Sequence, residues 1–338
     1  MPELSFAAGD PLISVVVCSY TTARLPDIQQ LLLALQQETY GRLETVFVSD
    51  GSPELLEHVA GFVSAEGLTR VQAVLNDERP GLAASRNAGV GHSAGDIIAF
   101  IDDDALPFAG WGGSIAAAMA AEDIAGVTGP AFPLWEDESL AWLPEEFFWL
   151  VSCPTPGWLG RDQVTDVRNA WGMNMAFKAD VFRTCRFPEE LGYRHGAASA
   201  PSHLLGEDTA FSVLVRQRTG KRIIFDPAVQ VRHKVYRHRL TPLSVRRRAF
   251  WEGYTKATMR RLARSDIWTG LDLAPERDQI WRIAGGFLPR TVAGLAREPS
   301  ASWRRLRLAA DALSHAALGY AAGTVPGLGR LVCKRFSR

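Results

Sequence analysis

Residues 95–107 read Gly95-Asp96-Ile97-Ile98-Ala99-Phe100-Ile101-Asp102-Asp103-Asp104-Ala105-Leu106-Pro107. The apolar part, Ile97 to Ile101, predicts a buried strand of a parallel sheet. Three carboxylates follow it, and like charges repel one another and cannot be buried unpaired. We therefore expect them at the carboxyl end of the strand, in a crevice, facing a cation.

Two of the three carboxylates, Asp102 and Asp104, should lie on the same side, because side chains alternate along an extended chain. Such a D-x-D pair can hold a hard divalent metal together with the phosphates of a nucleotide. Asp103 should point away and serve the loop. From the motif alone, an acidic, solvated turn remains an alternative.

The composition predicts a folded chain with two differently charged parts. The chain has 338 residues, of which 47% are apolar and 22% charged, which excludes a disordered chain and allows one large or two small domains. The formal net charge is zero, yet residues 1–229 hold 15 Lys and Arg against 30 Asp and Glu. Residues 230–338 hold 22 against 7. This asymmetry suggests different partners for the two parts.

No segment indicates export or a membrane span. The cysteines have no zinc-ligand or redox spacing, so a reduced cytosolic compartment fits best; they are Cys18, Cys153, Cys185 and Cys333. Residues 1–10 lack a basic segment before an apolar core, and we expect no signal peptide. The longest uncharged stretch, 312–328, is too short and too mixed to span a bilayer.

The first hundred residues alternate between strand and helix patterns. Apolar strands are expected at 12–18, 44–49, 71–75 and 97–101, and helical periods at 25–37, 54–65 and 82–92. This order predicts an α/β fold: a doubly wound, mostly parallel sheet with helices on both faces. Ligands of such sheets bind outside the carboxyl ends of the strands. Three polar strand ends should line that crevice: Cys18-Ser19-Tyr20, Asp50-Gly51-Ser52 and Asp102-Asp103-Asp104.

Two common phosphate-binding motifs are missing from the sequence. No G-x-G-x-x-G follows the first strand, and there is no G-x-x-x-x-G-K-[ST] loop. A nucleotidyltransferase, which should carry a glycine-rich phosphate loop at this point, is therefore disfavoured. We expect the nucleotide to be held through carboxylates and a metal.

The rest of the chain leaves more alternatives open. A helix is expected over 111–121, a strand over 125–132 and two short strands within 221–231. The aromatic segment 134–158 is either core or a platform for an acceptor. Asp208, at the start of an amphipathic helix, fits an N-cap position, which is its structural alternative. A basic helix over 243–262 and helices over 280–296 and 303–322 follow.

Six motifs, in order over roughly residues 12–235, resemble the inverting nucleotide-sugar glycosyltransferases of family 2, which have the GT-A fold. The motifs are Ser14-Val15-Val16-Val17-Cys18-Ser19-Tyr20, Val48-Ser49-Asp50-Gly51-Ser52, Gly81-Leu82-Ala83-Ala84-Ser85-Arg86-Asn87, Phe100 to Asp104, Gly172-Met173-Asn174-Met175-Ala176-Phe177 and Gly206-Glu207-Asp208. The resemblance implies a GT-A catalytic domain over 1–235, with a nucleotide-sugar half at about 12–132 and an acceptor half at about 133–235.

The resemblance also implies roles for single residues. Asp102, Asp104 and His233 would hold Mg²⁺ or Mn²⁺, with Asp104 the direct ligand. Asp208 would be the general base that deprotonates the acceptor hydroxyl, and Glu207 would help to place the acceptor. The candidate donor-binding residues are Cys18, Ser19, Tyr20, Asp50, Arg86, Asp102, Asp103, Trp171 and Asn174.

The chain departs from the commonest pattern of the family. The second strand ends Ser49-Asp50-Gly51 where a paired Asp-Asp-Gly is usual, which leaves one carboxylate for the base, and Thr21 replaces the usual Asn. Processive synthases carry Q-x-x-R-W, whereas the nearest segment here is Arg247-Arg248-Ala249-Phe250-Trp251. A single transfer is therefore expected.

The segment 248–257 and the basic tail look like a subgroup that acts on lipid-linked acceptors, similar to dolichyl-phosphate-sugar glucuronosyltransferases. Residues 236–338 would form a basic helical extension. It would pack on the catalytic domain or lie on an anionic membrane, with the protein peripheral on the cytoplasmic membrane face.

Two functions of different class follow. The first is a metal-dependent enzyme that moves a sugar from a nucleotide-diphosphate sugar, with UDP expected, to a lipid-linked or glycan acceptor; nucleic acid is not an expected partner. The alternative is a non-catalytic protein that binds sugar nucleotide or glycan with the same fold. A missing carboxylate at position 102, 104 or 208 would have favoured the alternative, and none is missing.

Overall fold

The structure, a computed structural model, describes residues 9–156, 162–192, 206–262 and 274–325. They fall into two compact units. We call residues 9–133, 162–192 and 206–234 the sheet unit, and residues 134–156, 235–262 and 274–325 the helical unit. The expectations for residues 1–8 and for the basic residues from Arg330 onward lie outside the described residues.

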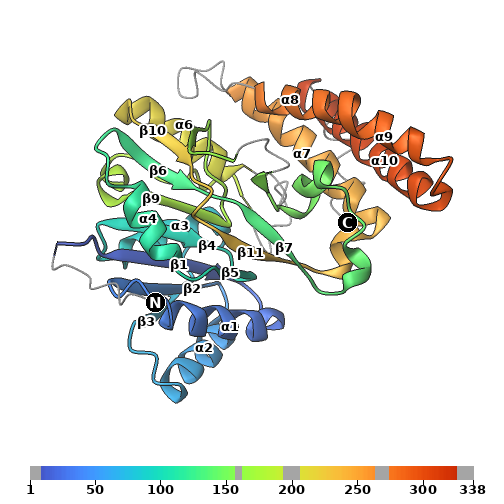
Figure 1. The fold of residues 1–338 in the computed structure, drawn as a ribbon. Helices are drawn as coiled ribbons and strands as arrows, with labels where there is room; N and C mark the ends of the chain where they lie inside the picture. Colours follow the sequence, from blue (N-terminus) through green and yellow to red (C-terminus); the bar gives the residue numbers. More distant parts are fainter. Residues whose placement is uncertain (1–8, 157–161, 193–205, 263–273, 326–338) are drawn as a thin grey trace. The chain divides into compact units, whose positions relative to one another are not determined.

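The first half of the sheet unit has the expected alternation (Figure 1). Its four parallel strands lie in the order β3 (Val71–Asn76), β2 (Leu43–Asp50), β1 (Ile13–Ser19) and β4 (Ile97–Ile101). The helices between them are α1 (Leu25–Gln36), α2 (Pro53–Ala65) and α3 (Leu82–Gly91), and the 3-10 turn η1 (Thr22–Arg24) precedes α1. The α/β fold predicted from the sequence is confirmed in these elements.

The sheet continues as a mixed one beyond β4. Its further strands are β9 (Asn174–Lys178), β6 (Ile124–Thr128), β10 (Arg222–Phe225) and β8 (Thr165–Asp166), in that order. Strand β9 runs antiparallel to both β4 and β6. A separate small sheet has the order β5 (Ala105–Pro107), β11 (Val231–Val235) and β7 (Ala131–Trp135).

One expected strand is two strands. The sequence predicts a single strand over residues 125–132, but β6 and β7 belong to different sheets and separate at Gly129-Pro130. Pro130 has no backbone N–H to donate to a ladder. A Cβ at Gly129 would lie 1.8 Å from the carbonyl oxygen of Val229, so only glycine lets the two backbones approach this closely.

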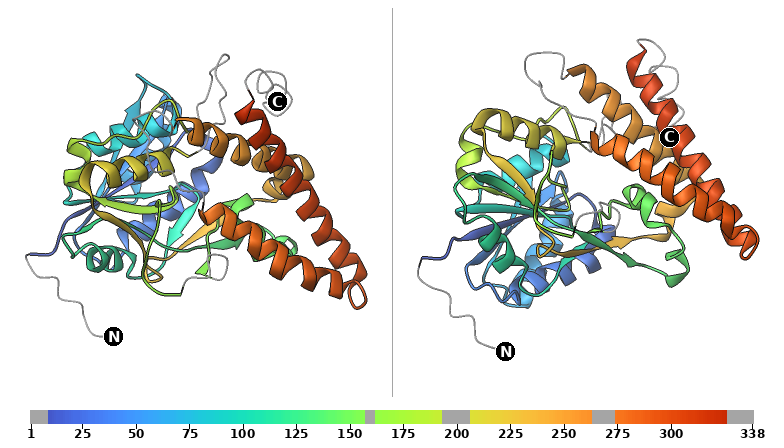
Figure 2. Two further views of the ribbon diagram at one scale, coloured as in Figure 1. Left: turned by 90° about the horizontal axis from the view of Figure 1, so that it is seen from above. Right: turned by 45° about the horizontal axis from the view of Figure 1, so that its top comes forward.

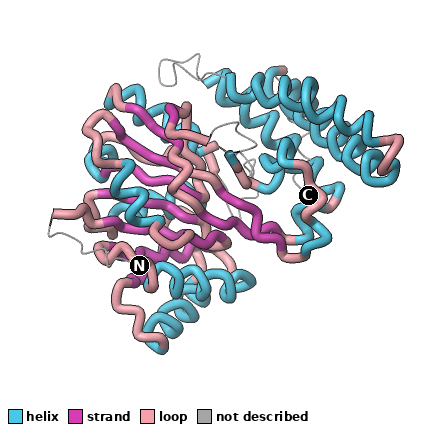
Figure 3. Tube along the Cα trace, viewed as in Figure 1, coloured by secondary structure: helices cyan, strands magenta, loops and turns pink. Residues whose placement is uncertain are grey.

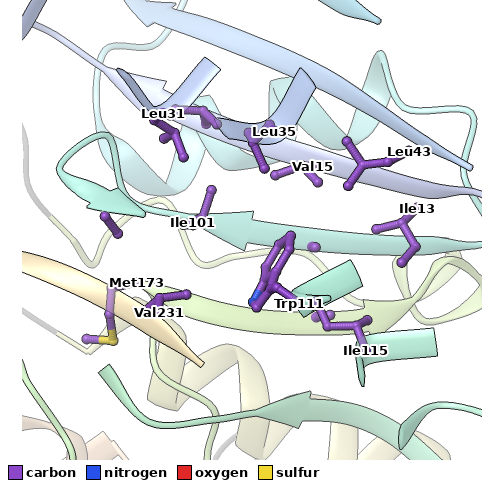
Figure 4. Packing of buried hydrophobic residues seen from close by; sticks show 14 of the residues in the cluster. Ile13, Val15, Leu31, Leu35, Leu43, Ile101, Trp111, Ile115, Met173 and Val231 are labelled. Atoms are coloured by element: carbon purple, nitrogen blue, oxygen red, sulfur yellow. The ribbon is translucent and has the colours of Figure 1, made fainter. Parts of the chain in front are cut away.

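Helices cover both faces of the sheet, as expected. On one face, Val15 and Val17 of β1 share a core with Leu31 of α1 and with Trp111 and Ile115 of α4 (Trp111–Ala118). Figure 4 shows the Trp111 ring between Val15 and Ile115. On the other face, a Cβ at Gly89 of α3 would lie 2.4 Å from Val16 Cγ1, so α3 packs directly on β1.

The same second face carries a phenylalanine cluster that fixes α6 (Glu207–Thr219). Phe211 of α6 lies 4.9 Å from Phe177 of β9 and 4.1 Å from Phe187, measured between ring centroids. Phe187 in turn lies 5.1 Å from Phe100 of β4. This packing fixes the first turn of α6, with Glu207 and Asp208, relative to the strand that precedes the three aspartates.

The helical unit consists of 3-10 turns and long helices (Figures 2 and 3). Its helices are α7 (Pro242–Leu262), α8 (Ala274–Arg282), α9 (Leu288–Gly294) and α10 (Pro299–Thr324), with the π-helical turn η6 (Ile283–Phe287) between α8 and α9. Its 3-10 turns include η2 (Glu138–Leu140), η3 (Glu145–Val151) and η5 (Arg237–Leu240). Phe147 and Phe148 are buried with Ile283 and Phe287, so the aromatic segment supplies core to this unit.

Glycines allow α7 and α10 to cross at close range. A Cβ at Gly319 would lie 1.9 Å from the carbonyl oxygen of Phe250, and one at Gly253 would lie 2.0 Å from that of Ala316. Within the described part of the chain, no helix is both long and apolar enough to cross a membrane.

Candidate active site

The carboxyl ends of β1, β2 and β4 lie at one edge of the sheet. Ser19 is opposite Ser49 in the register of β1 and β2, and Val16 is opposite Phe100 in that of β1 and β4. Ser19 is buried, and Tyr20 just beyond it is 41% exposed. Burial raises the pKa of the Cys18 thiol, which favours the neutral thiol over the nucleophilic thiolate.

Asp102, Asp104 and His233 come together at this edge. Each offers one ligand atom, and the three atoms lie within 4.8 Å of one another. Asp104 and His233 are buried, with His233 Nε2 3.1 Å from Asp104 Oδ1. The strand topology explains the meeting, because β11 pairs antiparallel with β5 and puts His233 opposite Ala105, directly after the aspartates.

This set of side chains fits a divalent metal. Carboxylate oxygens suit Mg²⁺ and Mn²⁺, and a neutral imidazole is a common additional ligand of transition metals. The Asp102 side chain keeps 34% of its surface exposed, so the cluster has an open side toward a ligand. The three residues are those that the sequence predicts as metal ligands.

Asp103 does not simply serve the loop. It is buried, and its carboxylate is ion-paired with Arg24 at the end of η1. Arg24 Nη1 also lies 3.3 Å from Asp104 Oδ2. Burial raises the pKa of Asp103 to about 6, although Arg24 and the Ser19 hydroxyl act against that rise.

Sequence analysis did not single out Arg24, although a signal for it exists. Three adjacent carboxylates at a strand end need a cation, and Arg24 is the one basic residue in the polar turn 19–24 after the first strand. The turn brings its guanidinium to the aspartates, 79 residues away in the chain. Arg24 therefore belongs to the candidate site.

Arg86 joins the aspartates to α6. Its side chain is buried, Nη1 donates to Glu207 Oε1 at 2.8 Å, and Nη2 lies 3.4 Å from Asp102 Oδ1. Burial favours a lower pKa for Arg86, but the charges of Glu207 and Asp102 outweigh it and raise the pKa. The Arg86 guanidinium thus contacts Asp102, which follows β4, and Glu207, in the first turn of α6.

Asp208 is the second residue of α6, not its N-cap. The N-cap is Gly206, with φ 94°, so the alternative interpretation of Asp208 as an N-cap is wrong by two residues. Asp208 Oδ2 accepts a hydrogen bond from the Gly172 backbone at 3.1 Å, and Oδ1 accepts one from the Thr209 backbone at 2.6 Å. Its neighbour Glu207 has a raised pKa because it is buried, although Arg86 opposes the rise.

Three candidate donor-binding residues have structural partners that account for their positions. Asn174 is fully buried: it accepts from Trp111 Nε1 at 3.0 Å and donates to the Val229 carbonyl at 2.7 Å. Both oxygens of Asp50 accept from the Gly81 backbone, at 2.9 and 3.0 Å, and so tie β2 to the start of α3. The half-buried Trp171 packs edge-on against Phe225. The structure does not bring Asn174 to the open side of the site.

Comparison with solved structures gives the fold. The chain superposes on a mannosyltransferase from Pyrobaculum calidifontis, solved with GDP-Man and Mn²⁺, with a TM-score of 0.56 and 19% identity over 98% of this chain and 86% of that one. It also matches GalNAc-T7, solved with UDP, GalNAc and Mn²⁺, with a TM-score of 0.52 and 15% identity over 85% and 58%. The fold is that of the GT-A glycosyltransferases.

Sequence comparison gives the family. Residues 14–188 match the profile of glycosyl transferase family 2, and the chain belongs to this family of enzymes. It is 31% identical to the glucosyl-dolichyl phosphate glucuronosyltransferase of Haloferax volcanii over 73% of this chain and 77% of that protein. It is also 32% identical to the glycosyltransferase AglE of the same organism, over 30% of this chain and 33% of the relative.

Proposed function

We propose that this glycosyltransferase transfers a single sugar from a UDP-sugar to a hydroxyl of a lipid-linked or glycan acceptor, with inversion and with a divalent metal. The observation that carries the proposal is the link through Arg86, which bonds both to Asp102 of the metal-ligand cluster and to Glu207, next to Asp208. This link supports a single site in which the donor binds near Asp102 and the acceptor binds near Asp208.

Asp208 is the proposed general base. Its carboxylate takes the proton of the acceptor hydroxyl while the hydroxyl oxygen forms a bond to the anomeric carbon. The bond from that carbon to the diphosphate breaks on the opposite side, and the nucleoside diphosphate leaves with the electron pair. One displacement inverts the configuration at the anomeric carbon.

The aspartates and His233 are the proposed ligands of Mg²⁺ or Mn²⁺. When bound, such an ion neutralises the charge that develops on the leaving diphosphate. Asp102, with its exposed carboxylate, faces the donor in this proposal, and Asp104 and His233 form the buried side of the cluster. Glu207 holds Arg86 and thereby positions the acceptor side.

The donor residues of the proposal come from the strand ends. Cys18, Ser19 and Tyr20 follow β1 and would lie beside the nucleoside, with Asp50 at the base. Trp171 and Asn174 belong to the same proposed donor side, where Asn174 acts through the buried framework that it bonds. Tyr20 is the exposed member and presents an aromatic face.

A lipid-linked acceptor is supported by the Haloferax volcanii relative, whose name specifies a dolichyl phosphate sugar. We further propose that the enzyme works on the cytoplasmic face of a membrane, where such an acceptor would be anchored. The basic residues of 236–338 support this location, because anionic lipids attract them.

The proposal is tested by UDP release with Mn²⁺, a panel of UDP-sugars and lipid-phosphate acceptors. We expect Asp208→Asn to lower turnover by about 100-fold or more while metal-dependent UDP binding persists. Asp104→Ala should abolish both. Asp123→Asn, an exposed carboxylate of the same unit paired with Arg222, is the matched control and should stay active.

Two results would contradict the mechanism. Full turnover of Asp208→Asn would remove the proposed base, and a product that retains the donor's anomeric configuration in NMR spectra would exclude direct displacement. Mass analysis of the product checks the single transfer, since a processive enzyme would give a ladder of masses.

A further inference from the structure

Large apolar side chains are exposed mainly on the helical unit. Among the described residues, the sheet unit exposes two, Tyr20 and Val164. The helical unit exposes Leu243, Ile280, Trp281, Val292, Trp303, Leu318 and Val325. Trp281 is 69% and Trp303 64% exposed, which is unusual because folded proteins bury most of a tryptophan.

These exposed residues are not part of the core of their own helices. The α8–α9 segment buries Ile283 and Phe287, and α10 buries Leu308, Ala309 and Ala312 in the same cluster. Trp281, Val292 and Trp303 lie at other positions and remain outside that cluster. The helical unit therefore has apolar surface beyond what its folding uses.

Basic side chains accompany this apolar surface. Residues 242–262 and 274–325 contain thirteen Lys and Arg against five Asp and Glu. Arg282 directly follows Trp281, and Arg307 lies one helical turn after Trp303. Both are exposed, and neither forms an ion pair with any residue that the structure describes.

We propose that α8, α9 and α10 dock the enzyme on an anionic lipid bilayer through Ile280, Trp281, Arg282, Val292, Trp303 and Arg307, which we call the tryptophan–arginine surface. Indole rings favour the membrane interface, and guanidinium groups bind lipid phosphates. Each basic residue near an anionic surface adds about fivefold to binding. The inference rests on the proposed function, in which the acceptor is lipid-linked.

The test is flotation of the full chain with vesicles of phosphatidylcholine alone or mixed with phosphatidylglycerol. We expect the protein to float with the anionic vesicles, and binding to fall as salt rises. The double variant Trp281→Ser, Trp303→Ser should bind at least about tenfold more weakly, with unchanged circular dichroism, since both side chains are exposed. Val164→Ser, an exposed apolar residue of the sheet unit, is the control and should float like the wild type.

A second variant separates charge from apolar contact. Arg282→Gln with Arg307→Gln should weaken binding to anionic vesicles and leave the weak binding to neutral vesicles unchanged. The inference is overturned if the wild type stays unbound, if the tryptophan variant floats like it, or if the same surface instead forms a dimer in light scattering.

Its failure is distinguishable from failure of the proposed function. UDP release with a short, water-soluble acceptor does not require a bilayer, so the tryptophan variant should keep it. Turnover without flotation would refute the docking surface alone. Flotation without turnover on any donor would refute the proposed function alone.

Discussion

The three aspartates at the end of β4 differ in what surrounds them. Asp102 is partly exposed and contacts Arg86. Asp103 is buried and forms an ion pair with Arg24. Asp104 is buried and contacts both Arg24 and His233. A divalent ion would add positive charge to a group of carboxylates that already has two cations, Arg86 beside Asp102 and Arg24 beside Asp103 and Asp104. Arg24 therefore balances charge in the absence of metal.

Replacing Arg24 by Gln leaves Asp103 and Asp104 buried without this cation. We expect the free energy of unfolding in chelator to fall by about 3 kcal/mol, because unpaired buried charges are costly. Mn²⁺ should raise the melting temperature more in this variant than in the wild type, since it replaces the lost charge. Arg79→Gln, which breaks an exposed pair with Glu189, is the control. Equal Mn²⁺ shifts in all three proteins would show that Arg24 plays no such part.

The raised pKa of Asp103 makes stability depend on pH. In chelator the folded protein holds this proton up to about pH 6, whereas the unfolded chain loses it near the ordinary pKa of 3.8. The folded state binds more protons in between, so the free energy of unfolding should fall by about 3 kcal/mol as pH rises from about 4 to about 6. Urea titrations of Asp103→Asn should lack this fall. A parallel pH profile for the two proteins would contradict the assignment.

Residue roles could be anticipated from the sequence only where a motif carries them. The family resemblance implies Asp102, Asp104 and His233 as metal ligands, and their ligand atoms lie within 4.8 Å of one another. Arg24 is not part of a recognisable motif, and its ion pairs with Asp103 and Asp104 depend on how η1 folds. Asn174 lies in a motif, but its side chain turns into the core toward Trp111, which periodicity alone does not show.

At the level of elements, the loop before β9 holds the two sides of the site together. Gly172 donates its backbone N–H to Asp208, and a Cβ on it would lie 2.5 Å from Arg86 Nη2. The loop thus contacts both the proposed base and the guanidinium that bonds to Glu207 and Asp102.

Gly172→Ala tests this arrangement without removing a charged residue. The added methyl group must displace the buried Arg86 guanidinium, which bonds to Glu207 and Asp102. We expect turnover to fall by about 10- to 100-fold, because small displacements in an active site are costly. Gly113→Ala in α4, where a Cβ would lie 4.0 Å from Tyr40, is the matched control. Steady-state kinetics of the two variants decide the matter; equal turnover would mean that Arg86 need not be held in place.

The crossing of α7 and α10 makes a second prediction about elements. Gly319→Ala places a methyl group 1.9 Å from the Phe250 carbonyl, and backbone cannot move aside cheaply. We expect the free energy of unfolding of the helical unit to fall by about 3 kcal/mol in urea titrations followed by circular dichroism. Gly285→Ala, which meets nothing within 4 Å, should be neutral or slightly stabilising. A stable Gly319→Ala protein would mean that the two helices do not approach this closely.

Most elements could be predicted from hydrophobic periodicity, and the misses have physical causes. The strands of the first half lie within one residue of their expected bounds, and Asp208 lies at the start of a helix, as expected. The expected strand 125–132 is two strands because Gly129-Pro130 lies inside an otherwise continuous apolar run. The antiparallel direction of β9 depends on how its long connection folds back, which no local pattern encodes.

At the scale of the whole molecule, charge and apolar exposure divide along the chain. The acidic first part contains every candidate ligand and base residue except His233, whereas the basic last part contains most of the exposed large apolar side chains. The sequence shows the charge asymmetry directly. It cannot show that Trp281 and Trp303 stay exposed, because that depends on which positions of α8 and α10 pack into the core of the helical unit.

This division predicts that donor and lipid protect different units. In hydrogen exchange followed by mass spectrometry, UDP with Mn²⁺ should slow exchange at the ends of β1, β2 and β4 and at the start of α6, since a ligand stabilises what it binds. Vesicles containing phosphatidylglycerol should slow exchange in α8, α9 and α10. Asp104→Ala should lose the first protection and keep the second, and Trp281→Ser with Trp303→Ser should do the reverse. If UDP with Mn²⁺ slows exchange only in α8, α9 and α10, the proposed location of the active site is wrong. If vesicles slow exchange only in the sheet unit, the proposed docking surface is wrong.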